Sequence, residues 1–355
     1  MKKALIHDPY LDTLGGGERY ALTFALALES FGYSVDLAWK DTSILASAQK
    51  RFNLKLKHTQ VCSECFDDLS LSAGLLRRYQ KTKDYDLVFW ISDGSLPFLF
   101  GKKNFVHFQV PITKLGGNFF TNFIKGLFIH KLVFNSNFTA GVIKKQLPFC
   151  SSVVLYPPID VDSFTPGKKE NIILSVARFD SPSHAKRQDI LIRCFGKVYE
   201  KNKDYKLILA GGLKGGEEYL ENVRSMAGKL PIQFVPNPDF AKLKKLYSKA
   251  KIFWHAAGYD IDETKEPEKV EHFGITTAEA MSAGAIPVVI DRGGQREIID
   301  GNTGYLCDSI EEMVNSTLSL INAPEKLKLM SGKAIERSKY FSIKVFEEKV
   351  RSTVI

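Results

Sequence analysis

Short apolar runs recur along the chain, and segments with apolar residues at helical spacing separate them. In the first half the runs lie at residues 5–7, 35–39, 86–91, 104–108 and 131–135. Runs of this kind, apolar at nearly every position, are typical of parallel strands that are buried on both faces. The pattern therefore predicts a parallel sheet covered by helices in the first half of the chain.

The same alternation restarts after residues 153–170, a stretch that carries three prolines and a glycine and predicts the interdomain connection. The later runs lie at residues 171–177, 205–211, 232–236, 251–256 and 285–290. We therefore expect an α/β protein of two doubly wound, Rossmann-like domains. The expected bounds are 1–165 for the first domain and 166–340 for the second. A C-terminal helix in 341–355 is expected to pack back on the first domain.

Length and composition agree with this organisation. At 355 residues the chain exceeds the roughly 250–300 residues at which a single hydrophobic core stops growing. No apolar run reaches the length of about 18 residues that a membrane-spanning helix needs. The N-terminus reaches Asp8 too soon for a secretory signal, so the cytoplasm is the expected compartment.

Five cysteines, at positions 62, 65, 150, 194 and 307, form an odd and scattered set. Such a set fits reduced thiols better than a disulfide framework. Cys62 and Cys65 form a CxxC pair, but no second pair accompanies them. Because structural zinc normally has four ligands, the pair does not favour a metal site.

Positive charge is concentrated in the first half of the chain. The net charge is +9, and no acidic residue stands between Asp93 and Asp160. Seven lysines lie in that interval, at 102, 103, 114, 125, 131, 144 and 145. The region 102–145 is therefore expected to be electropositive. No nucleic-acid-binding motif accompanies it, so we expect no nucleic-acid partner.

The segment 116–134 mixes Phe, Leu and Ile with Lys and His and contains no acid. Two interpretations remain open. A basic helix of this composition can lie on anionic lipid. Alternatively, it is a core-facing helix with a charged outer face, which is the commoner arrangement.

The segment EHFGITTAE, residues 271–279, frames a predicted helix start with two glutamates. Gly274 argues against one continuous helix, and residues 276–279 match the S/T-x-x-E signal, so a helix is expected to begin near Thr276. Glu271 then lies in the preceding loop. The backbone N–H groups at such a helix start attract anions. The alternative is a plain capping box, in which Glu279 bonds back to the Thr276 N–H.

Two further segments follow predicted strands. GGGER at 15–19 stands between a strand and a helix, where it allows close backbone approach to a phosphate, although it does not fit GxGxxG. The alternative is a flexible loop with Glu18 and Arg19 as helix-start charges. Arg178 and Lys186 follow the strand at 171–177, where cations could neutralise a diphosphate; the alternative is a solvated basic loop.

The joint order of these segments resembles the retaining glycosyltransferases of family 4, which have the GT-B fold. The resemblance rests on GGGER, YPPID at 156–160, Arg178 with Lys186, and EHFGITTAEAMSAGAIPVV at 271–289. A pair of glutamates separated by seven residues is the family hallmark, and Glu271 and Glu279 match it. Within the family, HDPYLDTLGGGER, NSNFT, YPPIDV and EHFGI are most similar to GDP-mannose-dependent α-1,2-mannosyltransferases of lipid-linked oligosaccharide assembly and to related bacterial glycosyltransferases.

The resemblance implies roles for individual residues. Glu271 would hold hydroxyls of the donor sugar, and Glu279 would hold the nucleotide ribose. Arg178 and Lys186 would offset charge on the leaving diphosphate. The segment Asp180–Ala185 is longer than the usual spacing between these two cations, so either Lys186 or Arg187 could take the second position. The implied diphosphate cradle is formed by the N–H groups of Phe273, Gly274, Ile275, Thr276, Gly16 and Gly17. His107 matches a histidine near the reacting sugar; the alternative is a core-packed histidine.

The expected protein is thus a retaining hexosyltransferase. It would move a sugar, with mannose favoured, from GDP-mannose or another nucleoside-diphosphate sugar to a glycan or lipid-linked glycan. The resemblance implies no metal and no protein nucleophile, and it implies polysaccharide or glycan synthesis at the cytoplasmic membrane face. The charge of the basic region 102–145 would allow peripheral contact with anionic lipid. Two alternatives are a nucleotide-sugar epimerase of GT-B fold and a non-catalytic nucleotide- or glycan-binding module.

Overall fold

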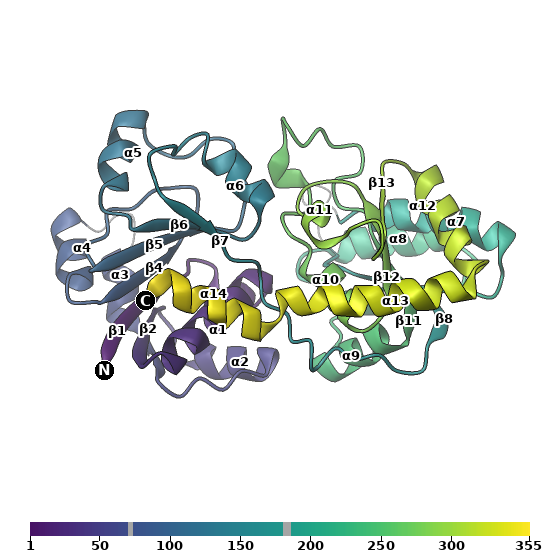
Figure 1. Cartoon of the computed structure of the whole chain (residues 1–355), viewed down its shortest axis with the longest axis horizontal. Helices are drawn as coiled ribbons and strands as arrows, with labels where there is room; N and C mark the ends of the chain where they lie inside the picture. Colours follow the sequence, from purple (N-terminus) through teal and green to yellow (C-terminus); the bar gives the residue numbers. More distant parts are fainter. Residues whose placement is uncertain (70–73, 180–185) are drawn as a thin grey trace. The chain divides into compact units, whose positions relative to one another are not determined.

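The computed structural model describes residues 1–69, 74–179 and 186–355 and divides the chain into two compact units. The first unit is Met1–Pro158 together with Ile343–Ile355, and the second is Ile159–Ser342. Each is a parallel sheet covered by helices (Figure 1). The α/β class expected from the apolar runs is confirmed.

The first unit holds a seven-stranded sheet in the order β3-β2-β1-β4-β5-β6-β7, with every neighbouring pair parallel. Its strands are β1 (Lys2–His7), β2 (Tyr33–Ala38), β3 (Thr59–Cys62), β4 (Leu87–Ile91), β5 (Lys103–Phe108), β6 (Lys131–Phe134) and β7 (Ser152–Val154). Its helices are α1 (Gly16–Ser30), α2 (Ser43–Phe52), α3 (Ser63–Leu69), α4 (Leu75–Thr82), α5 (Phe119–Gly126), α6 (Asn137–Ile143) and α14 (Ile343–Val354). The strand order reverses between β1 and β4, where open α/β sheets bind ligands beyond the carboxyl ends of their strands.

The second unit holds a six-stranded parallel sheet in the order β10-β9-β8-β11-β12-β13. Its strands are β8 (Glu170–Val176), β9 (Lys206–Gly211), β10 (Ile232–Pro236), β11 (Ala250–His255), β12 (Ile286–Ile290) and β13 (Tyr305–Cys307). Its helices are α7 (Gln188–Lys201), α8 (Glu217–Ala227), α9 (Phe240–Lys249), α10 (Ile275–Ser282), α11 (Gln295–Ile298), α12 (Ile310–Ile321) and α13 (Pro324–Ser338). Here the order reverses between β8 and β11.

Both faces of the first sheet are packed with apolar side chains, which explains why its central strands are apolar at nearly every position. Phe89 of β4 stacks on Phe24 of α1 at 4.0 Å between ring centroids, while its neighbour Trp90 packs on the opposite face. The C-terminal helix α14 lies along α1 (Figure 1) and adds Phe346 and Val350 to the same core. The last residues of the chain therefore help to complete the first unit.

The cysteines differ from the sequence expectation. Cys62 at the end of β3 and Cys65 in α3 form a disulfide, so the prediction of reduced thiols is wrong for this pair. The turn from strand to helix brings the two Cα atoms to 5.3 Å, a separation that a disulfide can span. Cys150, Cys194 and Cys307 are free and buried, and burial raises the pKa of each thiol.

Candidate active site

Glu271 is the centre of a charged cluster in the second unit. Lys186 donates a 2.9 Å hydrogen bond from Nζ to Oε2 of Glu271, and Nε2 of His255 lies 3.1 Å from the same oxygen. His255 ends β11 and is buried, while the Glu271 side chain is 17% exposed. Nδ1 of His255 faces the Ala257 N–H at 3.4 Å, an arrangement that leaves the ring proton on Nε2 to donate to Glu271.

The cluster keeps Glu271 ionised. Burial alone raises the pKa of its carboxyl, but the positive charge of Lys186 and the contact with His255 outweigh burial and hold the pKa well below its usual range. A carboxylate that stays ionised acts only as a hydrogen-bond acceptor. The site can therefore accept hydrogen bonds from ligand hydroxyls.

The structure distinguishes Lys186 from its neighbour Arg187. Arg187 forms a bidentate pair with Asp189, at 3.0 and 3.1 Å, and donates to the Tyr259 carbonyl at 2.9 Å. Its guanidinium therefore binds α7 and the loop after β11, and Lys186 is the cation on Glu271. The long segment Asp180–Ala185, which left the choice between Lys186 and Arg187 open, lies outside the described residues.

Two glycines hold the backbone of the Glu271 loop. The Gly294 N–H donates to the Glu271 carbonyl at 2.8 Å, and a Cβ added at Gly293 would lie 2.1 Å from that carbonyl oxygen. Gly293 also has a positive φ of 62°. Only glycine permits this approach without moving the loop. The sequence analysis did not identify this pair, although GG two residues after the 285–290 strand signals a close backbone approach.

The helix after Glu271 begins almost where the sequence predicted. α10 starts at Ile275, with Gly274 as its N-cap at φ 109°. Thr276 is thus inside the helix, and the capping-box alternative is wrong because it requires Thr276 as the capping residue. By helix geometry the N–H groups of Ile275 and Thr276 have no acceptor within α10 and point out of its N-terminus. Phe273, directly before the cap, is buried.

Glu279 lies on the buried side of α10. It is 4% exposed, and its Oε2 accepts a 3.0 Å hydrogen bond from the hydroxyl of Tyr247 on α9. Tyr247 is itself held by Phe164, with ring centroids 5.1 Å apart. Glu271 and Glu279 thus come from the same short segment, but one is in a loop and the other in a helix. The sequence did not identify Tyr247.

Arg178 follows β8 and is exposed at the carboxyl edge of the second sheet. Gly211 of β9 packs directly against the adjoining backbone, since a Cβ there would lie 1.9 Å from the Ala177 carbonyl oxygen. The Phe179 N–H donates to the Gly212 carbonyl at 2.9 Å. The glycines after β9 therefore serve first to fix the backbone that carries Arg178.

In the first unit, Gly16 and Gly17 begin α1 at the carboxyl end of the sheet. Glu18 is buried and accepts from the Gly15 N–H at 2.5 Å and from the Thr13 hydroxyl at 2.7 Å. It lies in the first turn of α1, so the alternative that Glu18 is a helix-start charge agrees with its position. A Cβ at Gly17 would lie 2.0 Å from the side-chain oxygen of Gln109, which explains the glycine at that position.

His107 occupies the core of the first unit. It is fully buried in β5, stacks on Tyr20 at 4.2 Å and contacts the Val133 carbonyl through Nδ1 at 3.1 Å. Burial lowers its pKa to about 3, so the ring is neutral. This geometry is that of a core-packed histidine. A role beside the reacting sugar stays a prediction.

Asp8 and His7 were not assigned a role from the sequence. His7 stacks on Trp90 at 3.6 Å, and burial lowers its pKa to about 4. Asp8 directly follows β1 and accepts from the Tyr10 N–H at 3.0 Å. Burial, with a smaller contribution from Glu18, raises the pKa of Asp8 to about 7. A carboxyl that titrates near neutrality at the carboxyl edge of a sheet is a candidate functional group.

Two features are absent from the described ranges 1–69, 74–179 and 186–355: a metal-ligand cluster and a membrane-spanning helix. No group of three or more His, Cys, Asp or Glu residues is placed to hold a metal ion. No helix there is both long and apolar enough to cross a membrane.

Similar proteins were sought in sequence and structure. A family model described as glycosyl transferases group 1 matches residues 159–337, half of the chain. A GDP-Man:Man(3)GlcNAc(2)-PP-Dol alpha-1,2-mannosyltransferase of Dictyostelium discoideum is 28% identical over 62% of this chain and 46% of its own length. An alpha-1,3/1,6-mannosyltransferase of the same organism is 28% identical over 70% of this chain and 64% of its own length. The chain thus spans less than two thirds of each relative.

Solved structures match over nearly the whole chain. A glycosyltransferase from Rickettsia africae has a TM-score of 0.76 at 18% identity, with 99% of this chain and 97% of that chain covered. HepE of Anabaena, crystallised with UDP and glucose, has a TM-score of 0.71 at 16% identity, with 99% of each chain covered. At these identities the likeness concerns the fold, and the expected GT-B fold is confirmed.

Proposed function

The chain belongs to the group 1 glycosyl transferases, and from this premise we propose that it is a retaining hexosyltransferase. It moves a hexose, mannose by preference, from a nucleoside-diphosphate sugar to a glycan or lipid-linked glycan. Mannose is favoured because three relatives named as mannosyltransferases match at 28–31% identity, and the names of two of them specify GDP-Man as the donor. The retaining mechanism and family 4 membership rest on the paired glutamates Glu271 and Glu279.

The observation that carries the proposal is the contact of Lys186 and His255 with one oxygen of Glu271, directly before the N-terminus of α10. Because both contacts use Oε2, the other carboxylate oxygen, Oε1, accepts from the donor-sugar hydroxyls. The ionised state of Glu271 makes it a pure acceptor, which suits a polyhydroxylated ligand.

The diphosphate binds at the start of α10. N–H groups of Phe273 to Thr276 surround it, and the positive end of the helix favours its charge. Arg178 and Lys186 stabilise the negative charge that grows on the leaving nucleoside diphosphate. Glu279, held by Tyr247, accepts from the ribose hydroxyls.

In the reaction, the bond between the anomeric carbon and the diphosphate oxygen breaks, and the acceptor hydroxyl attacks from the face that the leaving group vacates. The donor phosphate takes the acceptor proton, so neither a protein nucleophile nor a metal ion is needed. Configuration at the anomeric carbon is retained. The acceptor stands at the cytoplasmic membrane face, and region 102–145 makes peripheral contact with anionic lipid.

A nucleotide panel tests the donor class. GDP, UDP, GDP-mannose and UDP-glucose are compared by the rise in melting temperature that each produces. Preferential stabilisation by GDP-mannose supports the mannose donor, and a UDP preference contradicts it. Product analysis follows: a sugar isomerised without an acceptor identifies an epimerase, and nucleotide binding without any turnover identifies a binding module.

Glu271→Gln tests the site directly. The amide keeps the volume of the carboxyl but removes its charge, so we expect turnover to fall about 100-fold or more. The GDP dissociation constant should change little, since Glu271 is assigned to the donor sugar and not to the nucleotide. Undiminished turnover would exclude the role given to Glu271.

A further inference from the structure

The helix α5 in the first unit buries a polar side chain and exposes apolar ones. Its buried side chain is Asn122, which donates to the Gly116 carbonyl at 3.1 Å, while Phe119 and Phe120 are 68% and 70% exposed. Leu127, one residue beyond the helix, is 71% exposed. The expectation that residues 116–134 form one core-facing helix with a charged outer face is therefore wrong. The helix is short, and its outer face is apolar.

The helix α4 likewise buries polar side chains and exposes apolar ones. Arg78 and Thr82 are buried, and Arg78 lies over the ring of Trp90 at 5.6 Å. Leu75 and Leu76, in the first turn of the helix, are 54% and 68% exposed. A helix of a water-soluble surface normally places such residues the other way round. Exposed apolar side chains on two helices of one unit indicate a surface that contacts an apolar partner.

Aromatic rings join the two helices into one face. Tyr79 of α4 contacts Phe100 at 5.3 Å, and Phe100 contacts Phe128 at 5.4 Å, just beyond α5. Phe98 contacts Phe128 at 5.8 Å, and the ammonium group of Lys125 lies 5.8 Å from the ring of Phe98. These contacts connect Tyr79 of α4 to Phe128, just beyond α5. We call the exposed apolar side chains of the two helices the α4–α5 face.

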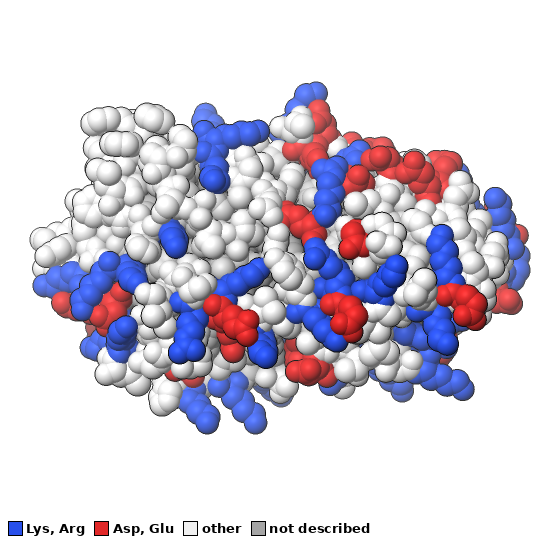
Figure 2. All heavy atoms as spheres, viewed as in Figure 1, with Lys and Arg blue, Asp and Glu red and all other residues white. Residues whose placement is uncertain are grey.

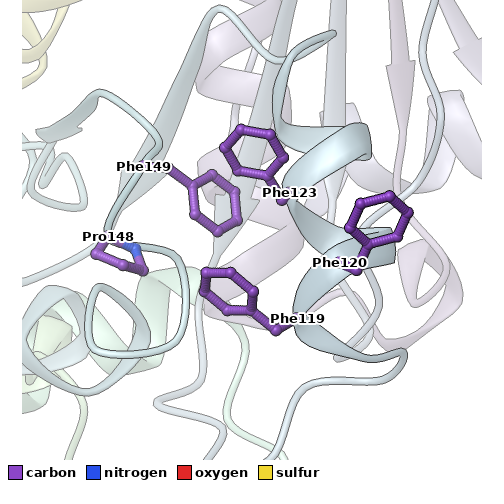
Figure 3. Close-up of a pocket in the computed structure, with 5 residues that line it drawn as sticks. All are labelled: Phe119, Phe120, Phe123, Pro148 and Phe149. Carbon is purple, nitrogen blue, oxygen red and sulfur yellow. The ribbon is translucent and has the colours of Figure 1, made fainter.

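The α4–α5 face includes a groove. It has a volume of about 500 Å³ and is lined by Phe119, Phe120, Phe123, Pro148 and Phe149 (Figure 3). Phe119 and Phe123 contact Phe149 edge-on, at 5.7 and 5.2 Å. The lining side chains are apolar throughout, so the groove suits a hydrocarbon chain and not a sugar or a nucleotide.

The charge around the face identifies the partner. No acidic residue occurs between Asp93 and Asp160, and Lys114, Lys144 and Lys145 are exposed within that interval. Figure 2 shows a white area over α5, with blue spheres beside it towards α6. Apolar side chains bordered by lysines match hydrocarbon bordered by anionic headgroups. A second copy of the chain would instead bring the same lysines against each other.

We propose that the α4–α5 face inserts into the hydrocarbon boundary of an anionic bilayer, with Phe119 and Phe120 as the deepest side chains. The inference rests on the proposed function, since it gives the acceptor's membrane a defined docking surface. It differs from adsorption of the basic region alone, because the apolar side chains and not the lysines supply most of the affinity. α5 follows the carboxyl end of β5, so docking places that edge of the first sheet near the lipid surface.

Flotation of the full chain with lipid vesicles tests the proposal. One set of vesicles is phosphatidylcholine alone, and the other contains about one third phosphatidylglycerol. We expect the double variant Phe119→Ser, Phe120→Ser to lower the partition coefficient at least about tenfold on the anionic vesicles, because two large apolar side chains no longer leave water. Lys144→Gln with Lys145→Gln should lower it only a few-fold.

Matched controls separate insertion from folding. Leu329→Ser removes an equally exposed apolar side chain, 62% exposed, from α13 of the second unit and should leave vesicle binding unchanged. Phe120→Trp keeps the apolar face, and its fluorescence should be quenched by lipids brominated on the acyl chain. Equal binding of the Phe119/Phe120 variant and the unaltered chain overturns the proposal. So does binding that 0.5 M salt abolishes completely, which indicates headgroup adsorption alone.

Three further outcomes have different consequences. A concentration-dependent dimer that the Phe119/Phe120 substitutions dissociate overturns the proposal in favour of a second copy as the partner. Vesicle binding needs no turnover, so an inactive but membrane-bound chain contradicts the proposed function and leaves the α4–α5 face intact. Conversely, full transfer to a water-soluble acceptor without vesicle binding overturns only this inference.

Discussion

The hydroxyl of Tyr247 donates a 3.0 Å hydrogen bond to Glu279, and this bond joins α9 to α10 inside the second unit. Glu279 is 4% exposed, so its carboxyl needs such donors to remain in place. The second glutamate of the pair is therefore oriented by a residue 32 positions earlier in the chain.

Tyr247→Phe removes this hydroxyl and keeps the ring. We expect a loss of about 1–3 kcal/mol in unfolding free energy, because a buried acceptor loses its donor. The GDP dissociation constant should rise about tenfold if the orientation of Glu279 serves the ribose. Urea unfolding and calorimetry measure the two effects. Tyr305→Phe is the control, since the buried Tyr305 hydroxyl has no hydrogen-bond partner in the described part of the chain; equal effects of both changes would contradict the assignment.

His255→Ala tests a contact residue of Glu271 that the sequence analysis did not identify. It leaves Lys186 as the cation on Glu271 but removes the ring that holds the carboxylate from the end of β11. Turnover should fall about 10- to 100-fold, since misplaced catalytic groups cost rates of this order. Steady-state kinetics provide the measurement, with the exposed His58→Ala as a control that should change nothing. An unchanged turnover in His255→Ala would mean that Lys186 alone orients Glu271.

Asp8→Asn should stabilise the protein in a pH-dependent way. The carboxyl has a pKa of about 7 in the folded chain, against an ordinary value of 3.8. The folded state therefore binds this proton more tightly, and the stability that the proton confers is lost as pH rises through 7. The advantage of Asn should grow by at most about 1.4 kcal/mol per pH unit between the two values.

Thermal unfolding from pH 5 to pH 8 checks this expectation. The Asn variant should gain melting temperature over the unaltered chain as pH rises, because its side chain stays neutral and its Oδ1 can still accept from Tyr10. The exposed Asp84→Asn should show no such trend. A constant difference across the pH range would contradict a raised pKa for Asp8.

Gly293→Ala should destabilise the second unit and impair the site together. The added Cβ would lie 2.1 Å from the Glu271 carbonyl oxygen, and the residue has a positive φ of 62°. Gly215→Ala separates the two causes, because Gly215 has a φ of 76° with no heavy atom within 4 Å of the added Cβ. We expect the Gly215 change to cost about 1 kcal/mol and the Gly293 change several.

Urea unfolding and turnover are measured for both glycine variants. Turnover should fall for Gly293→Ala alone, since only that change displaces the backbone of Glu271. Similar losses of stability in the two variants would show that backbone strain, and not the close approach to Glu271, explains Gly293.

Much of the fold followed from the sequence. The ten apolar runs all correspond to strands, because a parallel strand buried on both faces is apolar at almost every position. The short edge strands β3, β7 and β13 were not predicted, since none of them carries such a run. The start of α10 was predicted to within one residue, because a glycine followed by a capping signal is a local pattern.

The tertiary structure alone decided which side chains meet. Lys186 and Arg187 are adjacent in sequence, yet only Lys186 contacts Glu271, because Arg187 pairs with Asp189. The contact of His255 with Glu271 joins a strand end to a loop 16 positions later. The outward apolar face of α5 likewise followed from the position of the helix on the sheet. Periodicity in a sequence gives the faces of a helix or strand, but packing decides which face meets the core.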